Sequence, residues 1–188
     1  METTLEIEVK IACDDLDRIR DAGFNIEIVK PRYFEDNWLL DSTDQQLLKQ
    51  GAALRVRSVG GRGTITYKGV VRESATSPLK VREEIESGVG EPERIIQLFE
   101  RLGYYRSFRY QKYRTVYNLT LDGRKLEVVF DETPMGNFIE IEGDEANVLR
   151  VLEASGFSHR DIVRESYPEL QASHCRARGI PVEDLVFK

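Results

Sequence analysis

The amino-acid sequence predicts an α+β fold: a closed, mainly antiparallel eight-stranded β barrel, or tunnel, with flanking helices outside it. Two observations favour this class. Apolar and polar residues alternate over most of the first three quarters of the 188-residue chain, which is the period of a β-strand. Two segments, 91–104 and 144–157, instead carry apolar residues at helical spacing. We expect one domain over 1–188, with a core at about 3–170 and a C-terminal helical tail at 171–188.

The first half of the chain is expected to be rich in strands. The stretch EIEVK (6–10) predicts an opening strand, because β-branched residues alternate with charges. A short amphipathic helix should follow at 14–24, with Asp14 or Asp15 as its N-cap. Pro31 predicts an edge or a bulge in the long strand expected at 25–42. The remaining elements are a helix at 43–51, a hairpin at 53–69 that turns at Gly60 and Gly61, a loop at 74–78 and a strand at 79–87.

The second half combines two clear helices with three strands. Residues 91–104 predict the clearest helix, with Pro92 near its start and Gly103 at its end. Residues 109–143 predict a meander of three strands, which turns at 122–123 and again near 134–136. A second helix is expected at 144–157, and a weaker helical stretch begins near Tyr167.

The overall composition limits the classes of function. A net charge of −6 argues against a general nucleic-acid-binding surface. Cys13 and Cys175 have neither a metal-binding nor a redox spacing, and they do not form a disulfide framework. No stretch has the apolar length of a signal peptide or a membrane span. We therefore expect a soluble cytoplasmic protein with reduced cysteines and with no nucleic-acid or membrane partner.

One face of seven predicted strands carries charged or polar residues at every second position. A half-exposed antiparallel sheet explains any one such strand, and an open sheet with helices over its apolar side would explain all seven. In chain order the residues in phase are Glu6, Glu8 and Lys10; Arg55 and Arg57; Thr66 and Lys68; Lys80, Arg82, Glu84 and Glu86; Lys112 and Arg114; Glu127 and Asp131; and Glu140 and Glu142.

The kinds of charge on this face favour a closed tunnel over an open sheet. Arginine recurs in pairs, and its rigid fork of donors suits phosphate oxygens. Carboxylates on one face of a strand repel each other unless a cation lies between them, and Mg²⁺ or Mn²⁺ prefers such oxygen ligands. Cations and paired carboxylates together match a metal-bound polyphosphate. Closing the sheet would place these charges inside and turn the apolar faces outward, under the helices.

These residues resemble a known family. EIEVK resembles the ExExK signature of the CYTH superfamily, the triphosphate tunnel metalloenzymes, which includes class IV adenylyl cyclases and thiamine and inorganic triphosphatases. The resemblance extends from about Leu5 to about Tyr167. It continues in order through YFEDNWLLD, ALRVRS, TYKG, VREEIE, QKYR and VVFDETPMGNFIEIEG, and SYPEL resembles the family's C-terminal helix. One departure lies in KPRYFEDN, where Tyr33 and Phe34 remain but the acid that commonly precedes them in bacterial members is absent.

The resemblance implies roles for particular side chains, position by position. The carboxylates expected around a Mg²⁺ or Mn²⁺ ion, directly or through water, are Glu6, Glu8, Asp131, Glu140 and Glu142. The cations expected to line the tunnel and bind the triphosphate are Lys10, Arg55, Arg57, Lys68, Arg82, Lys112 and Arg114. A supporting or metal-contacting role is expected for Glu84 and Glu86.

The resemblance leaves the reaction open between two kinds of triphosphate chemistry. An adenylyl cyclase converts ATP to cyclic AMP and pyrophosphate, and FDETPMGNFIEIEG together with the chain length favours this cyclase-like subgroup. An inorganic or thiamine triphosphatase would instead hydrolyse the terminal phosphate of its substrate. A non-catalytic module that binds polyphosphate or a nucleotide is the alternative of another class. The partners expected are a nucleoside triphosphate or inorganic triphosphate and, by resemblance, a second copy in a homodimer; no single residue is assigned as a catalytic base.

Overall fold

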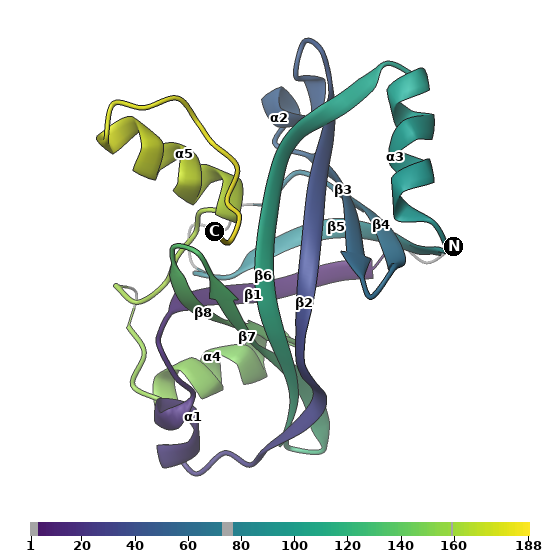
Figure 1. Ribbon diagram of the computed structural model, residues 1–188. Coiled ribbons are helices and arrows are strands. Elements are labelled where there is room, and N and C mark those ends of the chain that lie inside the picture. The colour runs from purple at the N-terminus through teal and green to yellow at the C-terminus, as the bar shows by residue number, and fades with distance from the viewer. Residues whose placement is uncertain (1–3, 73–76, 159) are drawn as a thin grey trace.

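The computed structural model describes residues 4–72, 77–158 and 160–188 (Figure 1). The loop predicted at 74–78 falls largely outside this part of the chain. Within it, eight strands form one closed barrel in the order β1-β5-β4-β3-β2-β6-β7-β8, and every neighbouring pair is antiparallel. The strands are β1 (Thr4–Ala12), β2 (Ile26–Ser42), β3 (Ala53–Val59), β4 (Arg62–Lys68), β5 (Lys80–Val89), β6 (Tyr104–Leu121), β7 (Arg124–Thr133) and β8 (Gly136–Glu142).

Five helices accompany the barrel in the described residues, and the predicted fold class is confirmed. Figure 1 shows α3 on one side of the long β2–β6 pair, with α5 and the C-terminal segment on the other side and α4 at the far end. None of these helices is long and apolar enough to cross a membrane. The helices are α1 (Asp17–Asp21), α2 (Gln46–Gln50), α3 (Pro92–Arg101), α4 (Glu145–Ala154) and α5 (Tyr167–Ala177).

The main apolar core lies between the barrel wall and the helices. Val9 and Ile11 of β1 point outward, and the alternating residues Glu8 and Lys10 point inward, because successive side chains of a strand face opposite ways. The outward residues pack with Ile139 of β8 and with Val148 of α4, all of which are almost fully buried. A second apolar cluster lies under α3, where Leu40, Leu54, Val56 and Ile96 meet.

The strand pair β2–β6 is longer than the other strand pairs and is irregular. Register shifts occur between Ile28 and Lys30 and between Lys30 and Tyr33, as Pro31 predicted. The strand β6 begins at Tyr104, not at 109, because residues 104–108 continue the pairing with the end of β2. This extension also provides the surface on which α3 packs through Phe99 and Tyr104.

Two predictions about where helices begin and end were wrong. The helix expected at 14–24 spans only Asp17–Asp21; Leu16 is its N-cap, and Asp15 instead accepts a hydrogen bond from the Asp17 amide. The tail expected to be helical over 171–188 is helical only to Ala177. Gly179 has a φ of +67°, which ends the helix, and the following segment runs beside β6, where Leu185 pairs with Tyr110.

Candidate active site

The barrel interior is a continuous cavity of about 1500 Å³. Its walls come from all eight strands, and one mouth is bordered by α2, α5 and the C-terminal segment. The inward positions predicted by alternation lie in this cavity wall, with the exception of Thr66 and Asp131, which are fully buried behind it. The lining residues from the predicted set are Glu6, Glu8, Lys10, Arg55, Arg57, Lys68, Arg82, Glu84, Glu86, Lys112, Arg114, Glu140 and Glu142.

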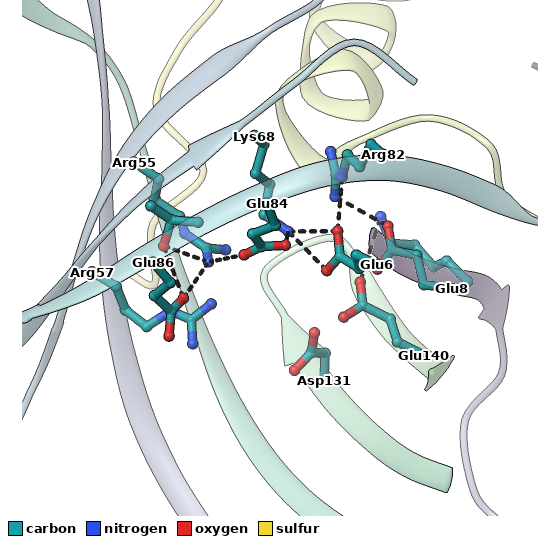
Figure 2. A network of polar contacts seen from close by, with 12 residues as sticks. Glu6, Glu8, Arg55, Arg57, Lys68, Arg82, Glu84, Glu86, Asp131 and Glu140 are labelled. Carbon is teal, nitrogen blue, oxygen red and sulfur yellow. Dashed lines mark hydrogen bonds and ion pairs between the residues drawn. The ribbon is translucent and has the colours of Figure 1, made fainter. Parts of the chain in front are cut away.

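The ExE pair of β1 is held by cations from two neighbouring strands (Figure 2). Glu6 accepts hydrogen bonds from Lys68 Nζ at 3.0 Å and from Arg82 Nε at 2.8 Å. Arg82 also donates to Glu8 at 3.1 Å, and Lys68 donates to Glu84 at 2.8 Å. Burial alone would raise the pKa of Glu6, but Lys68 and Arg82 outweigh it and lower that pKa to about 2. Glu6 is therefore ionised, and both β1 carboxylates have cationic partners.

A second cluster is centred on Asp131 of β7, whose side chain is 0% exposed. Arg114 donates two hydrogen bonds to it, at 2.7 and 2.6 Å, and Lys112 Nζ donates a third at 2.8 Å. The hydroxyl of Tyr167, the first residue of α5, donates a fourth at 2.8 Å. Arg114 also reaches Glu140 at 2.6 Å. Asp131 thus connects two tunnel cations with the helix that borders the mouth.

The two arginines of β3 complete the cationic wall. Arg55 lies 3.8 Å from Glu84 and 3.9 Å from Glu86, and it donates to the Thr66 hydroxyl at 3.2 Å. Arg57 lies 3.4 Å from Glu35, a residue of β2 that was absent from the predicted set. Figure 2 shows both arginine side chains directed toward Glu86.

Sequence reasoning missed Glu35, and the reason is local. Glu35 has the same strand phase as Tyr33 and Asn37, so alternation alone would have turned it inward. The expected irregularity at Pro31 obscured that phase. The sequence had identified Lys80 in the charged pattern without assigning it to the site, and it too lines the cavity.

Glu142 of β8 and the neighbouring Glu6, Glu8 and Glu127 form an oxygen-rich donor set in the tunnel. Burial raises the pKa of Glu142 to about 7, and the neighbouring charges of Glu6, Glu127 and Glu8 add to this. Mutual repulsion of this kind is relieved by a divalent cation, so the donor chemistry fits Mg²⁺ or Mn²⁺. Within the described residues, no three acidic, histidine or cysteine side chains are grouped closely enough to hold a metal ion. Glu6, Glu8 and Glu140 are instead paired with the tunnel cations Lys68, Arg82, Lys10 and Arg114.

The mouth beside α2 differs in character, because apolar side chains surround it. Leu48 and Val70 are more than half exposed, as is Val182 of the C-terminal segment. Leu39 and Phe108 line the same space. We call these five residues the apolar vestibule. The C-terminal segment therefore borders the tunnel mouth. It also packs on β6, where Leu185 joins an apolar cluster and the Phe187 ring lies 5.3 Å from the Tyr113 ring.

Fold and site together define a class of protein: an antiparallel barrel whose interior holds matched cations and carboxylates and whose apolar core lies outside. A family model, the CYTH domain, matches residues 4–158. The chain belongs to the CYTH family, as the sequence motifs indicated.

Individual proteins are similar to this chain in sequence or in fold. The chain is 27% identical over 182 residues to a Methanocaldococcus jannaschii protein named "Putative adenylate cyclase MJ0240", covering 89% of this chain and 98% of that protein. The structure of PH1819 from Pyrococcus horikoshii is similar, with a TM-score of 0.70, 22% identity and coverage of 90% and 99% of the two chains. The adenylyl cyclase candidate HpAC1 from Hippeastrum, described as having a dominant triphosphatase activity, matches with a TM-score of 0.61, 17% identity and coverage of 94% and 97%.

Proposed function

We propose that this protein is a divalent-metal-dependent enzyme that binds a triphosphate inside its tunnel and cleaves it. One observation carries the proposal: seven predicted phosphate-binding cations and four predicted metal-binding carboxylates line a single cavity of about 1500 Å³. A structural sheet domain has no need to enclose so many charges, since burying an ion costs several kcal/mol unless it is partnered. The enclosed charges are therefore explained by a highly charged ligand.

The cations would bind and orient the phosphate chain. Arg55 and Arg57 offer planar forks from one strand, while Lys112 and Arg114 offer donors from the strand beyond β2. Negative charge spreads over the phosphoryl oxygens as a phosphoanhydride bond breaks, so fixed cations lower the barrier by electrostatic stabilisation. In the ligand-free chain these cations hold carboxylates, and binding would exchange carboxylate partners for phosphate oxygens.

The carboxylates Glu6, Glu8, Glu140 and Glu142 would hold the metal, with Glu84 and Glu86 in support. Asp131 has four hydrogen bonds to protein groups already, which favours a positioning role for it over direct metal contact. A bound Mg²⁺ or Mn²⁺ supplies positive charge to the phosphate oxygens and orients them. Occupation of these carboxylates competes with the ion pairs that Arg82 and Lys68 make with Glu6 and Glu8.

Formation of cyclic AMP from ATP is the reaction that we place first. The apolar vestibule adjoins the cationic wall, and an adenine ring would bury apolar surface there, whereas inorganic triphosphate has none. In this reaction the ribose 3′-oxygen bonds to the α-phosphorus, the bond to the β-phosphate breaks, and pyrophosphate leaves as the 3′-hydroxyl loses its proton. The name of the M. jannaschii relative supports the same choice.

Hydrolysis of the terminal phosphate is the second candidate. The cavity of about 1500 Å³ exceeds the roughly 300–1,000 Å³ of an ordinary ligand pocket, which leaves room for water beside a bound triphosphate. The triphosphatase activity described for the Hippeastrum protein points the same way. The tunnel cations serve either reaction, because both develop charge on phosphoryl oxygens.

One incubation series tests these proposals. Purified protein is incubated with ATP, thiamine triphosphate or inorganic triphosphate, with Mg²⁺ or Mn²⁺ or with a chelator, and the products are separated by chromatography. Cyclic AMP with pyrophosphate supports the cyclase, and orthophosphate with the corresponding diphosphate supports the hydrolase. Absence of any metal-dependent product from all three substrates rejects the enzyme.

A variant separates an enzyme from a binding module. Glu8→Gln should abolish most metal-dependent turnover and leave the fold intact, because Glu8 lies in the metal-binding set. A module that only binds polyphosphate would keep its affinity in the same variant. Glu27→Gln, which changes an exposed side chain of β2, is the matched control and should retain wild-type turnover.

A further inference from the structure

We propose that Glu35 is a resident counter-anion of the tunnel, which stabilises the ligand-free cationic wall and thereby limits its affinity for phosphate. The inference rests on the proposed function, because it concerns the same triphosphate-binding cations. Glu35 belongs to neither the metal-binding nor the supporting set, and its role is that of a positioning residue.

The location of Glu35 sets it apart from the other tunnel carboxylates. Its side chain is 0% exposed and does not line the cavity, so it lies behind the lining side chains. The nearest cations are Arg57, whose Nη1 is 3.4 Å from Oε1, and Lys112, whose Nζ is 3.6 Å from Oε2. A group behind the lining cannot contact a substrate directly, but its charge acts on the cations in front of it.

The electrostatics of Glu35 are dominated by these neighbours. Burial would raise its pKa, but Lys112, Arg114, Arg57 and Arg55, in that order of effect, hold the pKa well below its usual range. Glu35 is therefore a fixed negative charge at neutral pH. Within the described residues, Arg57 makes no other ion pair, whereas Lys112 also has Asp131 at 2.8 Å.

Unpartnered polar atoms gather around the same point. Seven buried side-chain polar atoms lack a hydrogen-bond partner in the described part of the chain, and six belong to four residues of this wall. They are both carboxylate oxygens of Glu35, both amide atoms of Asn37, and the Nε atoms of Arg55 and Arg57. Buried polar groups normally have hydrogen-bond partners, so this wall keeps donors and acceptors that a ligand could use.

Ion pairing without hydrogen bonds makes Glu35 a replaceable partner. Neither cation makes a hydrogen bond to Glu35, from which they lie at 3.4 and 3.6 Å, in contrast to the 2.6–2.8 Å contacts that Arg114 and Lys112 make with Asp131. A phosphate oxygen in the cavity could attract Arg57 away from Glu35 at low cost. The carboxylate still repels the incoming phosphate, because like charges in a partly desolvated site repel through short distances. Its net effect is weaker phosphate binding and easier product release.

Isothermal titration calorimetry of Glu35→Gln tests this role. Inorganic triphosphate is the probe, with a chelator present so that no turnover occurs. We expect E35Q to bind at least about threefold more tightly than the wild type, because one opposing charge is removed from the cationic wall. Its melting temperature should be lower without ligand and should rise more than that of the wild type when triphosphate is added.

Glu132→Gln is the matched control. Glu132 also pairs with an arginine, Arg32 at 2.7 Å, but on the outside of the barrel, so E132Q should bind triphosphate as the wild type does. Unchanged or weaker binding by E35Q overturns the inference. Weaker binding together with lower stability is the result for a merely structural residue. An E35Q chain that folds only with triphosphate or sulfate present supports it, and one that folds under neither condition overturns it. Failure of the wild type itself to bind inorganic triphosphate or ATP refutes the proposed function, and this inference with it.

Discussion

Replacement of Asp131 by asparagine removes the charge that holds two buried cations together. Asparagine keeps the shape of the side chain, but its amide nitrogen must face the donors of Lys112 or Arg114. Breaking a buried ion pair on one side costs about 3–5 kcal/mol, because the remaining charges lose their partner. We therefore expect D131N to lower the free energy of unfolding by about 4 kcal/mol. For a domain of this size that corresponds to a fall in melting temperature of about 8–16 °C.

Urea unfolding followed by circular dichroism measures the effect, without metal or triphosphate. Asp122→Asn is the control, since Asp122 also pairs with an arginine, Arg150, but at an exposed turn, and its loss should change the free energy by less than about 0.5 kcal/mol. Inorganic triphosphate should restore part of the lost stability in D131N, because it supplies anions to Lys112 and Arg114. If D131N unfolds within about 1 kcal/mol of the wild type, Asp131 is not the centre of the ion-pair cluster, and our account of that cluster is wrong.

Three further predictions address Tyr167 of α5, the apolar vestibule and Glu35. Tyr167→Phe removes one donor to Asp131 and should lower the free energy of unfolding by about 1–2 kcal/mol, which urea titration would show; no loss would mean that this hydrogen bond contributes nothing. Leu48→Glu should weaken ATP binding in calorimetry and leave inorganic triphosphate binding unchanged. Equal effects on both ligands would show that the vestibule is not part of the site. Leu98→Glu, which changes an exposed leucine of α3, is the control. The free energy of unfolding should be higher for the wild type than for E35Q, and this difference should be full above pH 4.5, the pKa of Glu35 in the unfolded chain. It should decline as the pH falls further, because the pKa of Glu35 is lower in the folded protein. Urea midpoints that differ by a constant amount at all pH values would contradict this.

The sequence predicted which side chains face the tunnel because that property is local. Alternation has a period of two, so Glu8 and Lys10 must lie opposite Val9 and Ile11 in any strand. The turns were equally local. Gly123 adopts a φ of +74° between β6 and β7, a conformation that glycine reaches without strain. Closure of the barrel was supported by the kinds of charge on the inner face and by the family motifs.

The partners of those charges could not be predicted from the same pattern. Arg114 pairs with Asp131 because β6 and β7 align these residues in register, and the register depends on the whole barrel. The contact between Tyr167 and Asp131 joins positions 36 residues apart through the packing of α5. The path of the C-terminal segment along β6 has no periodic signal either, since it depends on the edge that β6 leaves free near Tyr110.

The distribution of charge reconciles an acidic chain with an anionic ligand. The net charge of −6 gives the outer surface no long-range attraction for a triphosphate, so diffusion should bring the ligand to the mouth without electrostatic steering. Inside, each of the seven predicted phosphate-binding cations already has a carboxylate neighbour, as Arg82 has Glu6 and Glu8, which allows the wall to fold without ligand. The same pairing means that a ligand gains only the difference between its own phosphate contacts and the ion pairs it displaces. Affinity in such a tunnel is therefore set by how loosely the resident carboxylates are held. By this criterion the wall around Glu35 should exchange its partners more readily than the cluster around Asp131.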